Sequence, residues 1–233
     1  MSLKWNPEKA LAIATIALMS LAIWIVFFYL PEMRSGTGQI LDNSFKIFYF
    51  HLPIAFTAYF SFIVVLIASV QHLRLNSSKW DTVALSAAEV GVVFSFLVLV
   101  TGSIWAKATW GWYWVWEPRL TTSLVLMLVY LAYLMLRQAI EEPEKRARLA
   151  AVFGIVGFVS VPLSFLSIRL WRSAHPLMFG SSAYGGSGGG LEGTTLQLTL
   201  LINMAAFFLL FVTLLLYRVR NEELRDKIRS AYH

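Results

Sequence analysis

Six long apolar runs, separated by short polar connections, dominate the hydropathy pattern of this chain. They cover approximately residues 11–30, 47–70, 83–104, 122–136, 149–171 and 194–217. About 20 consecutive apolar residues in a helix are enough to cross the hydrocarbon core of a bilayer. The pattern therefore predicts an all-α membrane protein built as a bundle of six transmembrane helices. The fourth run is short, and we expect its helix to begin at Pro118, with Glu117 at the positive end of the helix dipole.

Composition supports a membrane location. Of the 233 residues, 58% are hydrophobic and 14% are charged, and the mean hydropathy is +0.66, whereas soluble domains are about 45–50% apolar. The chain contains no cysteine, which excludes a disulfide framework and any metal or haem attachment through thiols. The net charge of +6 is interpreted as a determinant of membrane orientation, and nucleic-acid binding is not expected.

The distribution of Lys and Arg predicts the orientation of the bundle. The two termini and the second and fourth connections hold thirteen of these residues, and the other three connections hold six. Because the more basic segments stay in the cytoplasm, both termini are predicted to be cytoplasmic. The outer face then carries residues 31–46, a Trp-rich loop at about 105–121 and a Gly-rich loop at about 172–193.

No linker or internal repeat divides the chain, so we expect a single integral membrane domain over residues 1–233. The Gly-rich loop holds seven of the fourteen glycines between Gly180 and Gly193. This composition is typical of a flexible connector. A phosphate-binding loop is not indicated, because no strand precedes the glycines and no Gly-Lys-Ser/Thr follows them.

The Trp-rich loop is the most unusual stretch of the sequence. It contains Trp110, Trp112, Trp114 and Trp116 at every second position. Tryptophan is a large apolar side chain with one N–H donor, so this cluster predicts an aromatic platform for a flat ligand. If the loop is extended, which we expect, all four side chains share one face. The alternative is an interfacial aromatic belt, to which Trp5, Trp24 and Trp80 are assigned.

Two of the four histidines lie at the rim of the predicted membrane region, on the same side as the platform. His51 is near the outer start of the second helix, and His175 follows the fifth. Each alone is consistent with a hydrogen-bonded structural histidine, but two neutral imidazoles together can supply both axial ligands of a haem iron. His72, in a short cytoplasmic connection, and His233, at the end of the chain, are expected to be solvated.

The chain resembles a known family in several of these segments. Residues 110–121, Trp-Gly-Trp-Tyr-Trp-Val-Trp-Glu-Pro-Arg-Leu-Thr, resemble the tryptophan-rich signature of the haem-handling proteins of cytochrome c maturation. The CcmC branch of this family is similar in four further features. These are the six apolar runs, the His-Leu-Pro at 51–53, the residues 101–105 that precede the Trp-rich loop, and the Trp-Arg-Ser-Ala-His-Pro at 171–176. Length and histidine count favour CcmC over CcmF and CcsA. The family usually has Asp where Glu117 stands and a small residue where Pro118 stands.

The resemblance implies a function. Such proteins bind haem b at the outer face of the inner membrane and deliver it to the haem chaperone CcmE, together with the ABC-type subunits CcmA and CcmB and the small membrane subunit CcmD. It also implies that His51 and His175 are the two iron ligands. We expect no catalytic residues, and the chain is interpreted as a carrier, with a lyase-like assisting role in chaperone loading left open.

From the residues themselves we expect Trp112, Trp114 and Trp116 to cover the porphyrin. Arg119, Arg172 and Lys107 are candidates for the propionates, since guanidinium groups suit carboxylates; interfacial anchoring is the alternative. Two other functional classes remain open, a b-type cytochrome in electron transfer and a permease subunit of a transporter. For a permease the only intramembrane acid is Glu89, which we interpret as a helix-pairing or partner contact. The charged stretch after the fourth helix and the tail are expected to be solvated.

Overall fold

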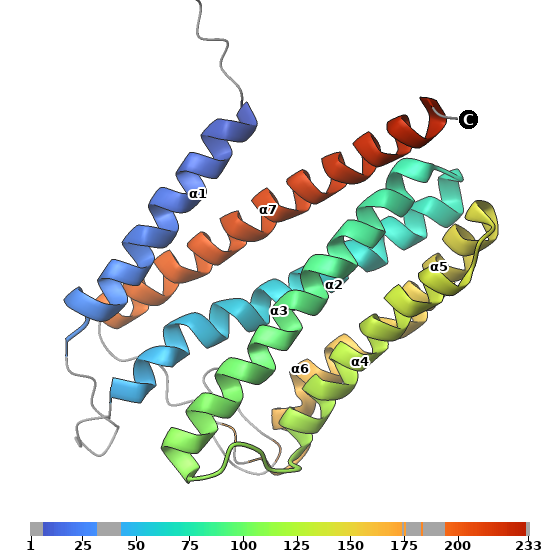
Figure 1. The fold of residues 1–233 in the computed structure, drawn as a ribbon. Coiled ribbons are helices and arrows are strands. Elements are labelled where there is room, and N and C mark those ends of the chain that lie inside the picture. The colour runs from blue at the N-terminus through green and yellow to red at the C-terminus, as the bar shows by residue number, and fades with distance from the viewer. Residues whose placement is uncertain (1–6, 32–42, 174, 176–182, 184–193, 232–233) are drawn as a thin grey trace, which may run out of the picture.

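The computed structural model describes residues 7–31, 43–173, 175, 183 and 194–231, and the regular elements within them are all helical (Figure 1). They are α1 (Pro7–Trp24), which continues into a π-helical turn η1 (Ile25–Tyr29), the short 3-10 helix η2 (Asn43–Ile47), α2 (Phe48–Leu75), α3 (Ser78–Trp110), α4 (Pro118–Ala139), α5 (Pro143–Gly157), α6 (Ser160–Leu170) and α7 (Thr194–Ala231). Six of the resulting spans are long and apolar enough to cross a membrane. The predicted six-span all-α fold is confirmed, and the chain is a multi-pass membrane protein.

Successive spans run in alternate directions, so the bundle has two distinct ends (Figure 1). At the first, here called the tryptophan end, α3 stops, α4 starts, and α6 stops. At the second, here called the arginine end, lie the α2–α3 and α4–α5 connections and the C-terminal part of α7. The start of α1 reaches the same end, where Tyr217 donates a hydrogen bond to the Glu8 carbonyl and Arg220 pairs with the Glu8 carboxylate.

The α2–α3 hairpin is the centre of the bundle, with α4 and α5 packed on one side and α7 on the other. α1 packs mainly on α7 and leans away from the remaining helices (Figure 1). The core is rich in aromatic side chains: the rings of Phe62 and Tyr130 stack with centroids 3.6 Å apart. Such contacts fix the helices that carry the two ends of the molecule.

The helices are longer than the apolar runs from which they were predicted. α4 begins at Pro118, as expected, with Glu117 at its N-cap. However, α3 continues to Trp110 and α2 to Leu75. At about 1.5 Å per residue, the 33 residues of α3 span roughly 50 Å, well beyond a hydrocarbon core of about 30 Å. Polar and aromatic residues next to an apolar run can therefore remain helical outside the membrane core.

The fifth run was expected to form one helix, but the structure breaks it into α5 and α6. The cause is Pro162. It has no N–H to bond to the carbonyl of Phe158, and its ring crowds that carbonyl. Phe158 and Val159 keep nearly helical backbone angles and bond to carbonyls three and four residues back. The interruption is thus a proline kink with satisfied backbone donors.

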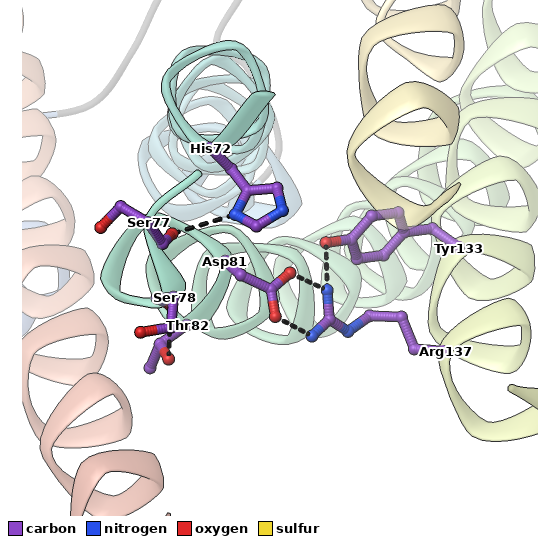
Figure 2. A network of polar contacts seen from close by, with 7 residues as sticks. All are labelled: His72, Ser77, Ser78, Asp81, Thr82, Tyr133 and Arg137. Carbon is purple, nitrogen blue, oxygen red and sulfur yellow. Dashed lines mark hydrogen bonds and ion pairs between the residues drawn. The ribbon is translucent and has the colours of Figure 1, made fainter. Parts of the chain in front are cut away.

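The arginine end contains a network of buried polar side chains (Figure 2). Arg137 on α4 donates to both carboxylate oxygens of Asp81 on α3, at 2.5 and 2.7 Å, and contacts the hydroxyl of Tyr133 at 3.4 Å. His72 was expected to be solvated, and this is wrong: it lies in the last turn of α2, is 8% exposed, and donates from Nδ1 to the carbonyl of Ser77 at 2.9 Å. The helix extends past the end of its apolar run, which is why His72 was misplaced.

Glu89 joins α3 to α7. Its carboxylate accepts from Arg218 at 2.5 and 2.9 Å, and Arg218 also pairs with Glu222. The interpretation of Glu89 as a helix-pairing residue is therefore confirmed. The expectation that the tail is simply solvated is wrong at Arg218, which is partly buried between these two carboxylates.

Candidate functional site

A cavity at the tryptophan end contains about 420 Å³ of empty space and collects the main residues singled out from the sequence. It lies between the tryptophan-end parts of α2, α3 and α4 and the residues after α6. Its lining includes two histidines, three tryptophans and one arginine: His51, His175, Trp105, Trp110, Trp114 and Arg119. This volume includes space that is open to solvent, so the site is a partly open cavity and not an enclosed pocket.

His51 is held rigidly. It is the fourth residue of α2, is 8% exposed, and its Nδ1 lies 2.8 Å from the hydroxyl oxygen of Thr101 on α3. Its ring packs against α3 at Gly102. A Cβ atom added to Gly102 would lie 3.1 Å from His51 Cε1. The neighbouring helix can approach the imidazole this closely only because residue 102 has no side chain.

His175 lies opposite His51. The centroids of the two rings are 6.4 Å apart and the ring planes are inclined by 38°. Two imidazoles that bind one metal from opposite sides, at metal–nitrogen distances of about 2.0–2.1 Å, have ring centroids roughly 6 Å apart. The separation is thus suited to a shared metal. Among the residues described, no group of three or more His, Cys, Asp or Glu side chains is positioned to hold a free metal ion.

Hydrogen bonds connect His175 to the Trp-rich loop. The backbone N–H of His175 donates to Ser173 Oγ at 3.1 Å, and the Ser173 hydroxyl donates to the carboxylate of Glu117. Trp105, which is buried, meets the His175 ring edge-to-face with centroids 6.3 Å apart. Glu117 therefore anchors the residues after α6 to the start of α4.

The Trp-rich loop is divided by its backbone. Trp110 is the last residue of α3, and Gly111 ends the helix at a positive φ of 79°, a conformation that favours glycine. Lys107 donates to the carbonyl of Gly111 at 2.9 Å. Residues 111–117 are non-helical. The expectation of one extended segment carrying all four tryptophans is wrong for Trp110, because α3 continues through residues 105–110.

The four tryptophans also differ in exposure. Trp110 and Trp114 line the cavity, and the Trp114 Nε1 atom is buried without a hydrogen-bond acceptor among the residues that the structure describes. Trp112 and Trp116 are 68% and 76% exposed. The Trp114 ring packs edge-to-face on Trp116, with centroids 5.5 Å apart. The loop thus presents two indoles to the cavity and two to its surroundings.

The basic candidates are placed differently from one another. Arg119 reaches the cavity from the first turn of α4, donates to the carbonyl of Ser164 at 2.6 Å, and lies 5.8 Å from the centroid of the Tyr59 ring. Arg172 is exposed and is not part of the cavity lining. The rest of the Gly-rich loop, apart from Ser173, His175 and Ala183, lies outside the described residues, as does His233.

The sequence analysis assigned no role to three residues that contact the histidines. Thr101 and Gly102 contact His51, and Ser173 bonds to the backbone of His175 and to Glu117. A glycine directly after a threonine, inside a long apolar helix, was the available signal for close packing. The side chain that Gly102 faces could be identified only once the packing of α2 on α3 was known. Ser173 belongs to the stretch at 171–176 that carries the family resemblance, but nothing in the sequence indicated its bond to Glu117.

These features define a class: a multi-pass membrane protein with a cavity at one end that is lined by two histidines and several indoles. The sequence model of the family CcmC, described as heme exporter protein C, matches residues 2–233. The chain belongs to this family.

Three relatives, each described as heme exporter protein C, illustrate the similarity. The protein of Bradyrhizobium diazoefficiens is 36% identical over 94% of this chain and 80% of its own length. That of Paracoccus denitrificans is 36% identical over 79% of this chain and 76% of its own length. That of Escherichia coli K12 is 30% identical over 91% and 81%, respectively.

Proposed function

We propose that this protein binds haem at the outer face of the cytoplasmic membrane and delivers it to the haem chaperone CcmE during maturation of c-type cytochromes. The relatives carry the description heme exporter protein C, which makes haem the cargo to consider. The observation that supports the proposal most directly is the pair of imidazoles, 6.4 Å apart in an indole-lined cavity.

The side chains of the cavity fit haem b chemically. His51 and His175 would ligate the iron, which accepts two neutral imidazoles. The indoles of Trp105, Trp110 and Trp114 offer apolar walls for the macrocycle. Arg119 brings a positive charge for a propionate carboxylate. The cavity is small, so a macrocycle would remain partly outside it and accessible to a partner.

The residues around the cavity suggest how the haem is presented. Trp112, Trp116 and Arg172 are exposed around the cavity end of the bundle, where they are available to the chaperone or to propionates that project outward. Glu117 would keep the two flanking segments together through Ser173. Holding and releasing haem needs no protein nucleophile, so the protein acts as a carrier that assists chaperone loading.

The proposal includes an assembly and a location. The charge asymmetry of the connections favours an inner-membrane protein with cytoplasmic termini and an external haem site. CcmA, CcmB and CcmD are the proposed partners within the membrane complex, and residues 1–233 form one integral membrane domain.

Absorbance spectroscopy of histidine variants tests the proposal. His51→Ala and His175→Ala, purified from the membrane, are each expected to lose the spectrum of six-coordinate, bis-histidine haem. His72→Ala is the matched control, because it removes a buried histidine at the arginine end. Undiminished bis-histidine haem in both site variants would overturn the proposal.

An electron-transfer cytochrome is the second candidate, since paired imidazoles also suit a permanent haem. The two functions differ in the effect that the chaperone has on the haem absorbance spectrum of the protein. A carrier loses its Soret band when purified CcmE is added, whereas an electron-transfer protein keeps its haem with a stable reduction potential.

A further inference from the structure

Thr101 has no assigned role, yet it is the hydrogen-bond partner of His51. Its hydroxyl oxygen lies 2.8 Å from His51 Nδ1 and 2.7 Å from the carbonyl oxygen of Leu97, one turn earlier in α3. A second carbonyl, that of Val98, is 3.3 Å away. The hydroxyl is therefore in contact with both a backbone acceptor and an imidazole nitrogen.

A threonine hydroxyl has one hydrogen to donate. A carbonyl oxygen can only accept, so the short contact to Leu97 requires that hydrogen. Toward His51 the Thr101 oxygen is then left as an acceptor, and Nδ1 of the imidazole must be the donor. A neutral imidazole that carries its hydrogen on Nδ1 has its free electron pair on Nε2.

We infer that Thr101 is a positioning residue that fixes the tautomer and the ring orientation of His51, so that Nε2 is ready to bind the haem iron. The inference rests on the proposed haem-carrying function and goes beyond it by assigning a residue that is not one of the proposed iron ligands. Hydrogen bonds from the second ring nitrogen of a metal-binding histidine orient the ring and raise its basicity.

The surroundings of His51 support this role. The backbone of α3 at Gly102 lies close to the ring: a Cβ atom added there would be 3.1 Å from His51 Cε1. His51 is also only 8% exposed. Water therefore has little access to replace the threonine. Because Thr101 and Gly102 are consecutive on α3, this helix sets both the hydrogen bond and the clearance of the imidazole.

Three variants of the full-length protein separate the hydroxyl from the shape of the side chain. Thr101→Val keeps the volume and removes the acceptor, Thr101→Ala removes the hydroxyl without adding a methyl group, and Thr101→Ser restores the hydroxyl. Thr57→Val is the matched control: Thr57 is a buried threonine on α2 whose hydroxyl bonds to the carbonyl of Pro53, four residues back.

Three measurements follow. In haem-free protein, nitrogen NMR of labelled histidine, assigned by difference with His51→Ala, is expected to show Nδ1 protonated and Nε2 unprotonated in the wild type and a mixture in Thr101→Val. In haem-loaded protein, Thr101→Val is expected to bind haem roughly tenfold more weakly, at the lower end of the effect of removing a partner of a metal-binding histidine. Its reduction potential is expected to rise, because the imidazole becomes a poorer electron donor to the ferric iron.

The outcomes distinguish this inference from the proposed function. Thr101→Ser close to wild type, with Thr57→Val unchanged, supports it. Wild-type NMR shifts and wild-type haem affinity in Thr101→Val would overturn the inference. So would a Thr101→Ser variant that binds haem as weakly as Thr101→Val. If Thr101→Val does not fold, Thr101→Ala gives the same decision. Retention of bis-histidine haem in both His51→Ala and His175→Ala would instead refute the proposed function itself.

Discussion

At the scale of single residues, the site depends on how closely two helices approach. His51 was identifiable from the sequence because an ionisable side chain at a membrane rim needs a polar partner or a ligand. Its partner was not identifiable, because Thr101 lies 50 positions away and meets it only when α2 packs on α3. Gly102 belongs to the same contact, and its missing side chain is part of the shape of the site.

Gly102→Ala tests that contact. The new methyl group would lie 3.1 Å from His51 Cε1, so the imidazole must shift by a few tenths of an ångström. We expect haem affinity to fall on the order of tenfold, as for other disturbances of a metal-binding histidine, and binding to be abolished in Gly102→Val. Titration of haem into the purified variants measures the effect.

The thermal stability of the haem-free protein is the control for this prediction. Alanine is more favourable than glycine inside a helix by about 1 kcal/mol, so Gly102→Ala is not expected to unfold at a lower temperature. Wild-type haem affinity in both variants would show that the close approach at Gly102 does not matter for binding.

At the scale of elements, the apolar runs predicted the number and type of the helices but not their ends. A hydropathy pattern marks where a helix crosses lipid, whereas the helix itself ends where its backbone is interrupted, as at Gly111 after α3. His72 was consequently assigned to a connection and Trp110 to an extended loop. The kink at Phe158 and Val159 has a cause visible in the sequence, Pro162, but proline within an apolar run does not by itself say whether the helix ends or bends.

The division of the Trp-rich segment leads to opposite predictions for its two pairs of tryptophans. Trp110 and Trp114 line the cavity, so their double replacement by Ala is expected to reduce haem retention. Trp112 and Trp116 are exposed, so their double replacement is expected to leave haem bound but to slow transfer to CcmE, on the order of tenfold or more for two aromatic contact residues. Spectra before and after mixing with the chaperone report both steps.

Trp24→Ala is the matched control, since Trp24 is a half-exposed tryptophan at the end of α1 that does not line the cavity. Its haem content and transfer rate should equal those of the wild type. If the two double variants behaved alike, the distinction between an inner and an outer pair of indoles would be wrong.

At the scale of the whole molecule, the two ends of the bundle differ in chemistry. The cavity with its histidines and indoles is at the tryptophan end, and the ion pairs Arg137–Asp81 and Arg218–Glu89 tie α3 to α4 and α7 at the arginine end. The sequence predicted this separation, because the basic connections alternate with the aromatic ones along the chain. It did not predict the ion pairs, since their partners are 56 and 129 positions apart.

The orientation of these ends decides whether haem is presented outside the cell membrane, and the absence of cysteine makes it directly measurable. Tyr113→Cys places one thiol at the tryptophan end, where the native side chain is 62% exposed, and Ser78→Cys places one at the arginine end, where the residue is also exposed. Because thirteen of the nineteen Lys and Arg residues lie in the terminal segments and in the second and fourth connections of the sequence, the arginine end is expected to face the cytoplasm. A membrane-impermeant maleimide should therefore label Tyr113→Cys in intact spheroplasts and Ser78→Cys only after permeabilisation, while the cysteine-free wild type stays unlabelled. The reverse pattern would put the histidine pair on the cytoplasmic side, and delivery to an external chaperone would then require the haem to leave the protein by crossing the bilayer first.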